Sequence, residues 1–288
     1  MRRLIRKLCF AIVCAALPAL SQKVAIHAPS SVSAGSSLAI TTTGSGSATL
    51  YLIGPSRVRK QSIKLGQQVE ISGQDVAASG NYRAVTCDSE GCVSAVFQVL
   101  PAKPTRLAFM LHPSRVPVST PKAVNGTALV SDRYHNTVIA PTKVDFHLSL
   151  GGESSTRSVK SVRGIAWFEI GSRPKQGALQ VVASVDDTAE PRVIQQVAAE
   201  ACGLRMSAAP SGHLVKLQTD PIRDCAGNPL PDGTIVSFTK TDAAGKSTVD
   251  TPIKKEKATA QFEVSGPAHI SVACGVVVGN ELTLGGRP

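Results

Sequence analysis

The side chains with the most reactive chemistry in this sequence are its seven cysteines. Cys87 and Cys92 flank the turn sequence Asp-Ser-Glu-Gly and lie between two runs of residues typical of β-strands. A hairpin at this point would place the two sulfur atoms opposite each other, close enough to form a disulfide. The alternative is a metal-binding or redox pair, for which no histidine or further cysteine lies nearby in the sequence. We therefore predict a disulfide between Cys87 and Cys92.

The histidines and acidic residues form no recognisable catalytic or metal-binding motif. The six histidines are scattered, and none belongs to an HExxH sequence. Gly245-Lys246-Ser247 looks like the end of a phosphate-binding loop, but Lys240 stands where that loop needs a glycine. The sequence holds neither a GxSxG elbow nor a DxDxDG calcium loop. We predict that the chain is not an enzyme and has no catalytic, cofactor-binding or metal-binding residues.

The N-terminal segment has the composition of an export signal. Four Lys or Arg residues precede an apolar run over 8–20, and Ala19-Leu20-Ser21 places small residues where a signal peptidase cleaves. We predict a signal peptide over 1–21, with a secreted, periplasmic or cell-surface location. The apolar run is shorter than the about 20 residues that span a membrane, and a retained anchor is the alternative. No other stretch is apolar enough, which predicts no integral membrane segment after cleavage.

Composition and periodicity indicate an all-β protein. Hydrophobic residues make up 42% of the chain but aromatic residues only 4%, so the cores must be built from Val, Ile, Leu and Ala. Apolar and polar residues alternate in short runs bounded by turn residues, as in 38–43, 143–148 and 234–238. Runs that recur about every ten residues are typical of β-sandwiches. Trp167, in the apolar run 165–170, is expected in the core.

Two joints divide the region that follows the signal. The first contains Pro101 and Pro104 and follows a strand-like run, and the second lies near Glu200, where one such run gives way to the next. The predicted domains are residues 22–101, 102–199 and 200–288. Each has about the size of one immunoglobulin-like unit.

An internal repeat connects the last two predicted domains. Four residues recur at identical spacing: Asp132, Asn136, Val144 and Phe146 in one, and Asp224, Asn228, Val236 and Phe238 in the other. Because side chains alternate with period two along a strand, the Val and the Phe should both face the core. The Asp and the Asn should bond nearby backbone groups and hold the loop before that strand. The repeat predicts two copies of one supersecondary plan.

The second copy resembles a known group of domains. The stretch from Asp224 to Phe238, DCAGNPLPDGTIVSF, is similar to the D-x-x-G-N-P-V-P-x-x-x-V-x-F signature of bacterial Ig-like domains of the invasin and intimin type, with one extra residue between the second Pro and the Val. In the first copy, His135 and Thr137 replace the Gly and Pro that flank the Asn. The resemblance implies tandem immunoglobulin-like β-sandwiches in which the motif shapes the fold and performs no chemistry. It also implies adhesin-like or surface-structural roles.

On this plan, three cysteines lie at one end of the last domain. Cys202 falls near the start of strand A, Cys225 between strands B and C, and Cys274 at the end of strand F. A zinc site is one option, but export favours one disulfide and one remaining thiol. Strands A and B are sheet neighbours, which favours Cys202 with Cys225. Cys274 takes the place of Ser184 in the repeat, so the fold accepts a small unbridged residue there.

The charge of the chain bears on its partner. The formal net charge is +11, which favours anionic surfaces. Dense Lys/Arg blocks interleaved with aromatic residues are missing, so nucleic acid is not an expected partner. We predict a binding, adhesion or spacer protein without catalysis, whose partner is an unknown protein or an anionic cell-envelope polysaccharide. The alternative is a secreted carbohydrate-binding accessory or hydrolase, which needs an aromatic platform or a pair of carboxylates.

Overall fold

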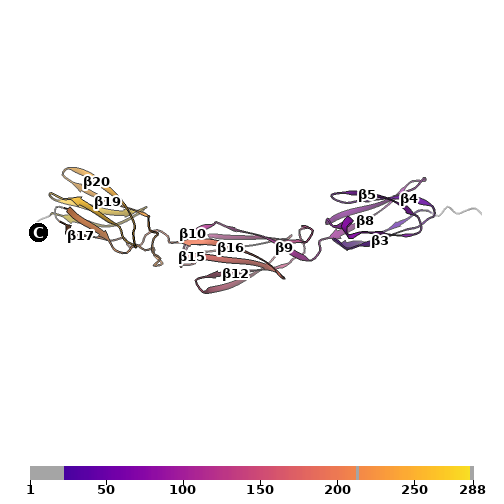
Figure 1. Cartoon of the computed structure of the whole chain (residues 1–288), viewed down its shortest axis with the longest axis horizontal. Coiled ribbons are helices and arrows are strands. Elements are labelled where there is room, and N and C mark those ends of the chain that lie inside the picture. Colours follow the sequence, from indigo (N-terminus) through magenta and orange to yellow (C-terminus); the bar gives the residue numbers. More distant parts are fainter. Residues whose placement is uncertain (1–22, 212–213, 286–288) are drawn as a thin grey trace, which may run out of the picture. The chain divides into compact units, whose positions relative to one another are not determined.

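The computed structural model describes residues 23–211 and 214–285, and its regular structure is almost entirely β-strand (Figure 1). The signal peptide predicted over 1–21 lies outside the described residues. The helical structure of the described part is η1 (Gly73–Val76), a single 3-10 turn. Nowhere in that part does a helix have the length and apolar character that a membrane crossing requires. The predicted all-β class is confirmed.

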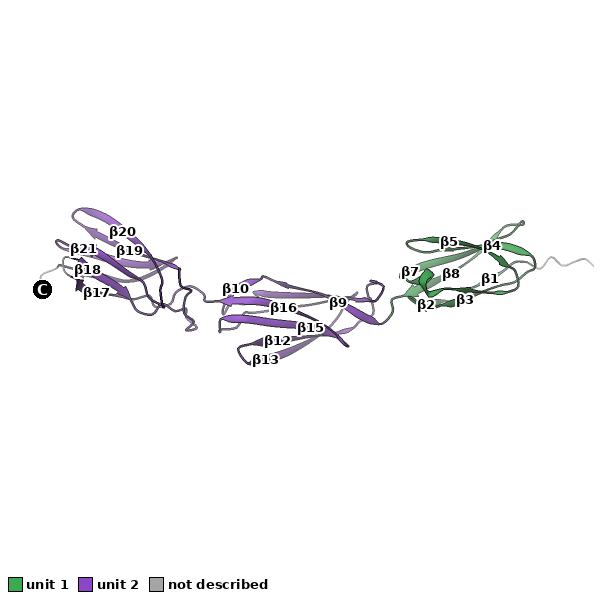
Figure 2. Ribbon diagram, viewed as in Figure 1, with its two compact units in different colours: residues 1–102 green, residues 103–288 purple. Residues whose placement is uncertain are grey.

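The chain divides into two compact units, residues 1–102 and 103–288 (Figure 2). The described part of the first unit is one sandwich, called the first sandwich below. Its strands are β1 (Ile26–His27), β2 (Ser31–Ser33), β3 (Leu38–Thr42), β4 (Ser47–Ile53), β5 (Val58–Lys64), β6 (Gln68–Ile71), β7 (Gly80–Cys87) and β8 (Cys92–Leu100). They form a smaller sheet, β1-β3-β6, and a larger sheet, β2-β8-β7-β4-β5.

The second unit begins with a sandwich of the same plan, called the second sandwich. Its strands are β9 (Pro104–His112), β10 (Arg115–Pro117), β11 (Val124–Asp132), β12 (Lys143–Leu150), β13 (Glu153–Lys160), β14 (Ile165–Ile170), β15 (Gly177–Val185) and β16 (Thr188–Val197). The smaller sheet is β14-β11-β9 and the larger is β10-β16-β15-β12-β13. The larger sheet has the strand order of its counterpart in the first sandwich, including the parallel pair at one edge.

The rest of the second unit forms the third sandwich. Its strands are β17 (Met206–Ser211), β18 (Leu214–Thr219), β19 (Ile235–Asp242), β20 (Gly245–Pro252), β21 (Thr259–Glu263), β22 (Ala268–Cys274) and β23 (Val277–Leu284). They form the sheets β17-β18-β21 and β20-β19-β22-β23, which share no strand with the second sandwich. Both predicted joints fall in segments that no described strand crosses. The division of the second unit into two separately folding domains stays a prediction.

The repeated residues line the two cores of the second unit. Val144 and Phe146 lie on β12, Val236 and Phe238 lie on β19, and all four side chains are fully buried. The rings of Phe146 and Phe168 pack with their centroids 4.6 Å apart. Period-two alternation therefore places the same residue types on the inward side of the same strand in both sandwiches.

Candidate binding surfaces

In the third sandwich, Asp224 organises the loop between β18 and β19. Its carboxylate accepts hydrogen bonds from the backbone N–H groups of Ala226 and Asn228, both at 2.9 Å, and of Ala199, at 3.0 Å. The Asn228 side-chain amide also donates to it. Burial alone raises the pKa of Asp224, but these hydrogen bonds outweigh burial and hold the pKa below its ordinary value. The aspartate is therefore a buried anion that ties its loop to the segment joining the two sandwiches.

Asp132 organises the equivalent loop of the second sandwich. Its carboxylate accepts hydrogen bonds from the N–H groups of Tyr134 and Asn136, both at 2.9 Å, and the Asn136 amide donates to it at 2.8 Å. The residue before the asparagine adopts a positive φ in both loops, +86° at Gly227 and +67° at His135. Glycine adopts this conformation freely and a residue with a Cβ does not. The second sandwich therefore holds the loop at a conformational cost that the third avoids.

Asn228 also connects the third sandwich to the second. Its side-chain oxygen accepts a hydrogen bond from the Gln176 N–H at 3.0 Å, and its amide group donates to the Pro174 carbonyl at 2.7 Å. Gln196, fully buried on β16, holds the same loop from the other side by donating to the Lys175 carbonyl at 2.8 Å. The motif asparagine, expected to bond within its own loop, therefore also pairs with the backbone of the neighbouring sandwich.

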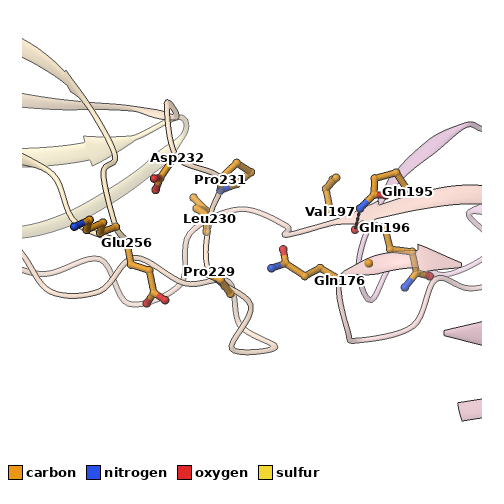
Figure 3. A pocket seen from close by; sticks show the side chains of 11 residues that line it. Gln176, Gln195, Gln196, Val197, Pro229, Leu230, Pro231, Asp232 and Glu256 are labelled. Carbon is orange, nitrogen blue, oxygen red and sulfur yellow. Dashed lines mark hydrogen bonds between the residues drawn. The ribbon is translucent and has the colours of Figure 1, made fainter. Parts of the chain in front are cut away.

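Figure 3 shows a groove at this junction, with a volume of about 620 Å³. Its lining includes Gln176, Gln195 and Gln196 from the second sandwich, and Pro229, Leu230, Pro231, Asp232 and Glu256 from the third. Arg223 donates a hydrogen bond to the Glu256 carboxylate at 2.6 Å. A second cavity of about 510 Å³ borders the connecting segment and is lined largely by Ala, Val, Leu and Pro side chains.

The structure joins the cysteines in the two expected pairs. Cys87 and Cys92 form a disulfide at the β7–β8 turn, and Cys202 and Cys225 form another beside the first strand of the third sandwich. Cys274 is a buried free thiol whose pKa is raised by burial. A thiol kept protonated in this way is a poor nucleophile. Within the described ranges, no three His, Cys, Asp or Glu side chains gather closely enough to hold a metal ion.

The outer face of the larger sheet in the first sandwich is basic. Residues paired in register share one side of a sheet, so Lys60 and Tyr51 lie side by side on the outer face. The Lys60 ammonium lies 5.8 Å from the centre of the Tyr51 ring. Lys64 and Arg83 face the same way: Arg83 lies one row from Lys60 and Lys64 lies two rows away on the other side. Tyr51, Lys60, Lys64 and Arg83 are called the basic face below.

Carboxylates are missing from the outward positions of β4, β5, β7 and β8, all of which lie in the described part of the chain. The aliphatic side chains of Ile53, Val58 and Val96 lie among the cations, with exposed fractions of 40%, 63% and 58%. The corresponding sheets of the other two sandwiches carry Asp145 and Asp250 on their outer sides. The basic face is therefore a property of the first sandwich and not of the shared fold.

The smaller sheet of the second sandwich exposes an apolar outer face. Two adjacent rows cross its three strands: Met110, Thr127 and Trp167, and then Ala108, Leu129 and Ile165. Trp167 is 65% exposed, so the expectation that it lies in the core is wrong. Ala166 and Phe168 take the inward positions on β14, and alternation turns Trp167 outward.

The sequence contained a signal for this orientation. The repeat aligns Ala166 and Phe168 with Ala260 and Phe262, which leaves Trp167 opposite Gln261. A position that is Gln in one copy and Trp in the other is an outward position. The junction contacts of Gln176 and Gln196 had no such signal, because they depend on how two sandwiches meet.

Known proteins resemble this chain in structure but not in sequence: neither a protein-family model nor a curated protein matches it. The Escherichia coli adhesin FdeC has a TM-score of 0.64 and 13% identity, over 93% of this chain and 97% of that one. Invasin, a bacterial integrin-binding protein, has a TM-score of 0.56 and 12% identity, over 93% of this chain and 60% of that one. Yersinia pseudotuberculosis InvD has a TM-score of 0.53 and 10% identity, over 93% and 98%. The likeness shows the fold, tandem immunoglobulin-like sandwiches, as predicted.

Proposed function

We propose that this chain is an exported bacterial Ig-like protein that binds an anionic cell-envelope polysaccharide and acts without catalysis. The observation that carries the proposal is the basic face of the first sandwich. There, three cations share one sheet surface with an aromatic ring and with no carboxylate. The fold that the chain shares with the adhesin FdeC and with invasin supports a binding role at the cell exterior.

The geometry of a sheet suits a chain-like anion. Outward side chains recur about every 6.8 Å along a strand and about every 4.8 Å across strands. The three cations do not occupy consecutive outward positions, so they are spaced to meet charges that lie several sugars apart on a polysaccharide chain. The Tyr51 ring offers an apolar surface to a sugar ring next to the Lys60 ammonium. Each exposed ion pair contributes at most about 1 kcal/mol and is screened by salt. Binding should therefore depend on several contacts together and weaken as salt is added.

The test uses polygalacturonate as the anionic probe and neutral dextran as its uncharged counterpart. The triple variant Lys60→Gln, Lys64→Gln, Arg83→Gln should bind polygalacturonate at least about tenfold more weakly, because three contacts are lost. The control, Lys216→Gln, Lys246→Gln, Lys254→Gln, removes the same charge from exposed positions of the third sandwich and should change affinity less than about threefold. Equal losses in both variants, or equal binding of dextran, would overturn the proposal.

One observation favours the hydrolase alternative: Asp232 and Glu256 line the same groove (Figure 3). The Glu256 carboxylate, however, is already engaged by the hydrogen bond from Arg223. Incubation with polygalacturonate should therefore release no reducing ends. If the wild type did release reducing ends and Asp232→Asn did not, the groove would be a catalytic site and not only a binding site.

A further inference from the structure

The apolar outer face of the second sandwich lies in a different unit from the basic face, and the proposed polysaccharide site does not use it. It consists of six outward residues of β9, β11 and β14, called the Trp167 face: Ala108, Met110, Thr127, Leu129, Ile165 and Trp167. Four of these are large apolar side chains with exposed fractions between 39% and 74%. Val162, 73% exposed, extends the face at the turn before β14. Contiguous exposed apolar surface of this kind usually marks an interaction site.

The fold itself does not require apolar side chains here. In the third sandwich, the register of β17, β18 and β21 fills the equivalent six positions with Ser207, Ala209, Lys216, Gln218, Thr259 and Gln261. Both sheets nevertheless bury the same inward pair, Ala166 and Phe168 in one and Ala260 and Phe262 in the other. Only the second sandwich has exposed apolar residues at these positions, so core packing does not explain them.

The ends of the Trp167 face carry opposite charges. Glu169 lies one row beyond Trp167 on β14, and its carboxylate is 3.8 Å from the ammonium of Lys122, a highly exposed side chain. At the other end, Arg106 lies one row beyond Ala108 on β9. Between these ends, the two rows of the face hold no charged residue.

An apolar face with opposite charges at its ends is complementary to a second copy of itself. A twofold axis in the plane of contact and perpendicular to the strands would lay each strand over its own copy and bring Glu169 of one copy into the same row as Arg106 of the other. The two residues would then be two strands, or about 10 Å, apart along the row, a distance that their long side chains can bridge. The same operation would place the apolar rows of the two copies against each other and remove Trp167 from water. The pair that Glu169 makes with Lys122 is exposed and weak, so it does not prevent this exchange.

The size of the face sets the strength of the contact. Three strands and four rows cover roughly 400 Å² per copy, from the usual strand and residue spacings. A stable complex buries about 800 Å² on each partner. We propose that the Trp167 face is a self-association surface through which two copies of this chain form a weak antiparallel dimer.

Sedimentation equilibrium of the exported protein tests the proposal. The wild type should self-associate with a dissociation constant of roughly 0.1 to 1 mM, as the small area implies. Trp167→Gln with Ile165→Thr, which installs the residues of the third sandwich, should weaken association at least about tenfold. Val193→Thr is the control, because Val193 is 57% exposed on the other sheet of the same sandwich, and it should leave association unchanged. If the double variant unfolds, Met110→Ala, also a third-sandwich residue, supplies the same test.

Charge reversal tests the arrangement of the two copies. Glu169→Arg and Arg106→Glu should each weaken association about fivefold, and the two together should restore it, because each residue then meets its complement on the other copy. A wild type that stays monomeric at 1 mM would overturn the proposal. So would an apolar variant that associates like the wild type, or a double reversal weaker than either single one.

Discussion

The second and third sandwiches agree in their buried residues and differ on their surfaces. Phe146 on β12 and Phe238 on β19 are both fully buried, each on the strand next to an edge of the larger sheet. On the outer side of the smaller sheet, Trp167 stands where the third sandwich has Gln261. Packing constrains the inward positions in both copies, whereas water accepts many residue types at the outward ones. Differences between the copies therefore locate the surfaces on which function can differ.

The loops before β12 and β19 differ in a second way. In the third sandwich, the Cys202–Cys225 disulfide links the loop to the segment before β17, and Gly227 occupies the position with positive φ. The Asn228 side chain also forms a hydrogen bond with the second sandwich. The second sandwich has His135 at the strained position and no disulfide among its described residues. The third sandwich thus has more local restraints around the same motif. Substitutions in the cores and in these loops measure what each feature contributes to stability.

The largest effect should come from the shared core residue. Phe238→Ala should cost about 3 to 5 kcal/mol in the third sandwich, and Phe146→Ala the same in the second, because each leaves a cavity. That approaches the whole stability of a marginal domain. Labelling of the buried Cys274 thiol reports unfolding of the third sandwich alone. Phe238→Ala should accelerate labelling and Phe146→Ala should not; equal acceleration would mean that the two sandwiches unfold together.

Removal of the Cys202–Cys225 disulfide should have the next largest effect on stability. Cys202 and Cys225 are 23 residues apart, and a loop of that length gives a disulfide contribution of about 3 kcal/mol on the chain-entropy model. Replacing both with Ser should lower the denaturation midpoint of the third sandwich accordingly. The pair Cys87 and Cys92, only 5 residues apart, should contribute about 2 kcal/mol to the first sandwich. A smaller loss from the longer loop would contradict the entropic account.

Asn228→Ala should loosen the junction. It leaves the Gln176 N–H and the Pro174 carbonyl without their partner, at a cost of about 2 kcal/mol. Proteolysis of the connecting segment 198–205 should become faster. Asn280→Ala is the matched control, because Asn280 bonds the Met206 backbone in the same paired manner within the third sandwich. Equal cleavage in both variants would show that Asn228 acts on its own sandwich only.

The glycine of the motif should contribute about 1 kcal/mol. Gly227→His places a side chain at a φ of +86° where space is open, so its cost is purely conformational. His135→Gly should relieve the strain in the second sandwich and stabilise it by a similar or smaller amount. Urea midpoints of the two variants give the measurement. Destabilisation by His135→Gly would show that the strain is smaller than the sum of the histidine contacts and the added entropy of the unfolded chain.

The smallest effect should be on the stability of the third sandwich at low pH. The folded pKa of Asp224 lies below its ordinary value of 3.8, so its ionised form contributes stability that is fully present above about pH 4. This contribution is lost as the pH falls through the lowered folded pKa. Asp224→Asn should therefore flatten the decline of the third-sandwich melting temperature below pH 4. A decline as steep in Asp224→Asn as in the wild type would contradict this role for Asp224.

The sequence by itself determined the fold class and the inward side of the strands. Alternation with period two identified Val144, Phe146, Val236 and Phe238 without any knowledge of their neighbours. The spacing around a turn was enough to pair Cys87 with Cys92, since a hairpin of known length fixes that distance. These properties depend on local geometry, which a linear sequence carries.

The tertiary structure alone decided what lies between sandwiches and across sheets. Asn228 reaches Pro174 and Gln176, more than 50 residues away, because the second and third sandwiches meet at that loop. Lys60 and Arg83 share the basic face, and Trp167 shares the apolar one with Met110, only through strand register. Such neighbours are set by how strands pair and sandwiches meet, and no spacing along the chain encodes those choices.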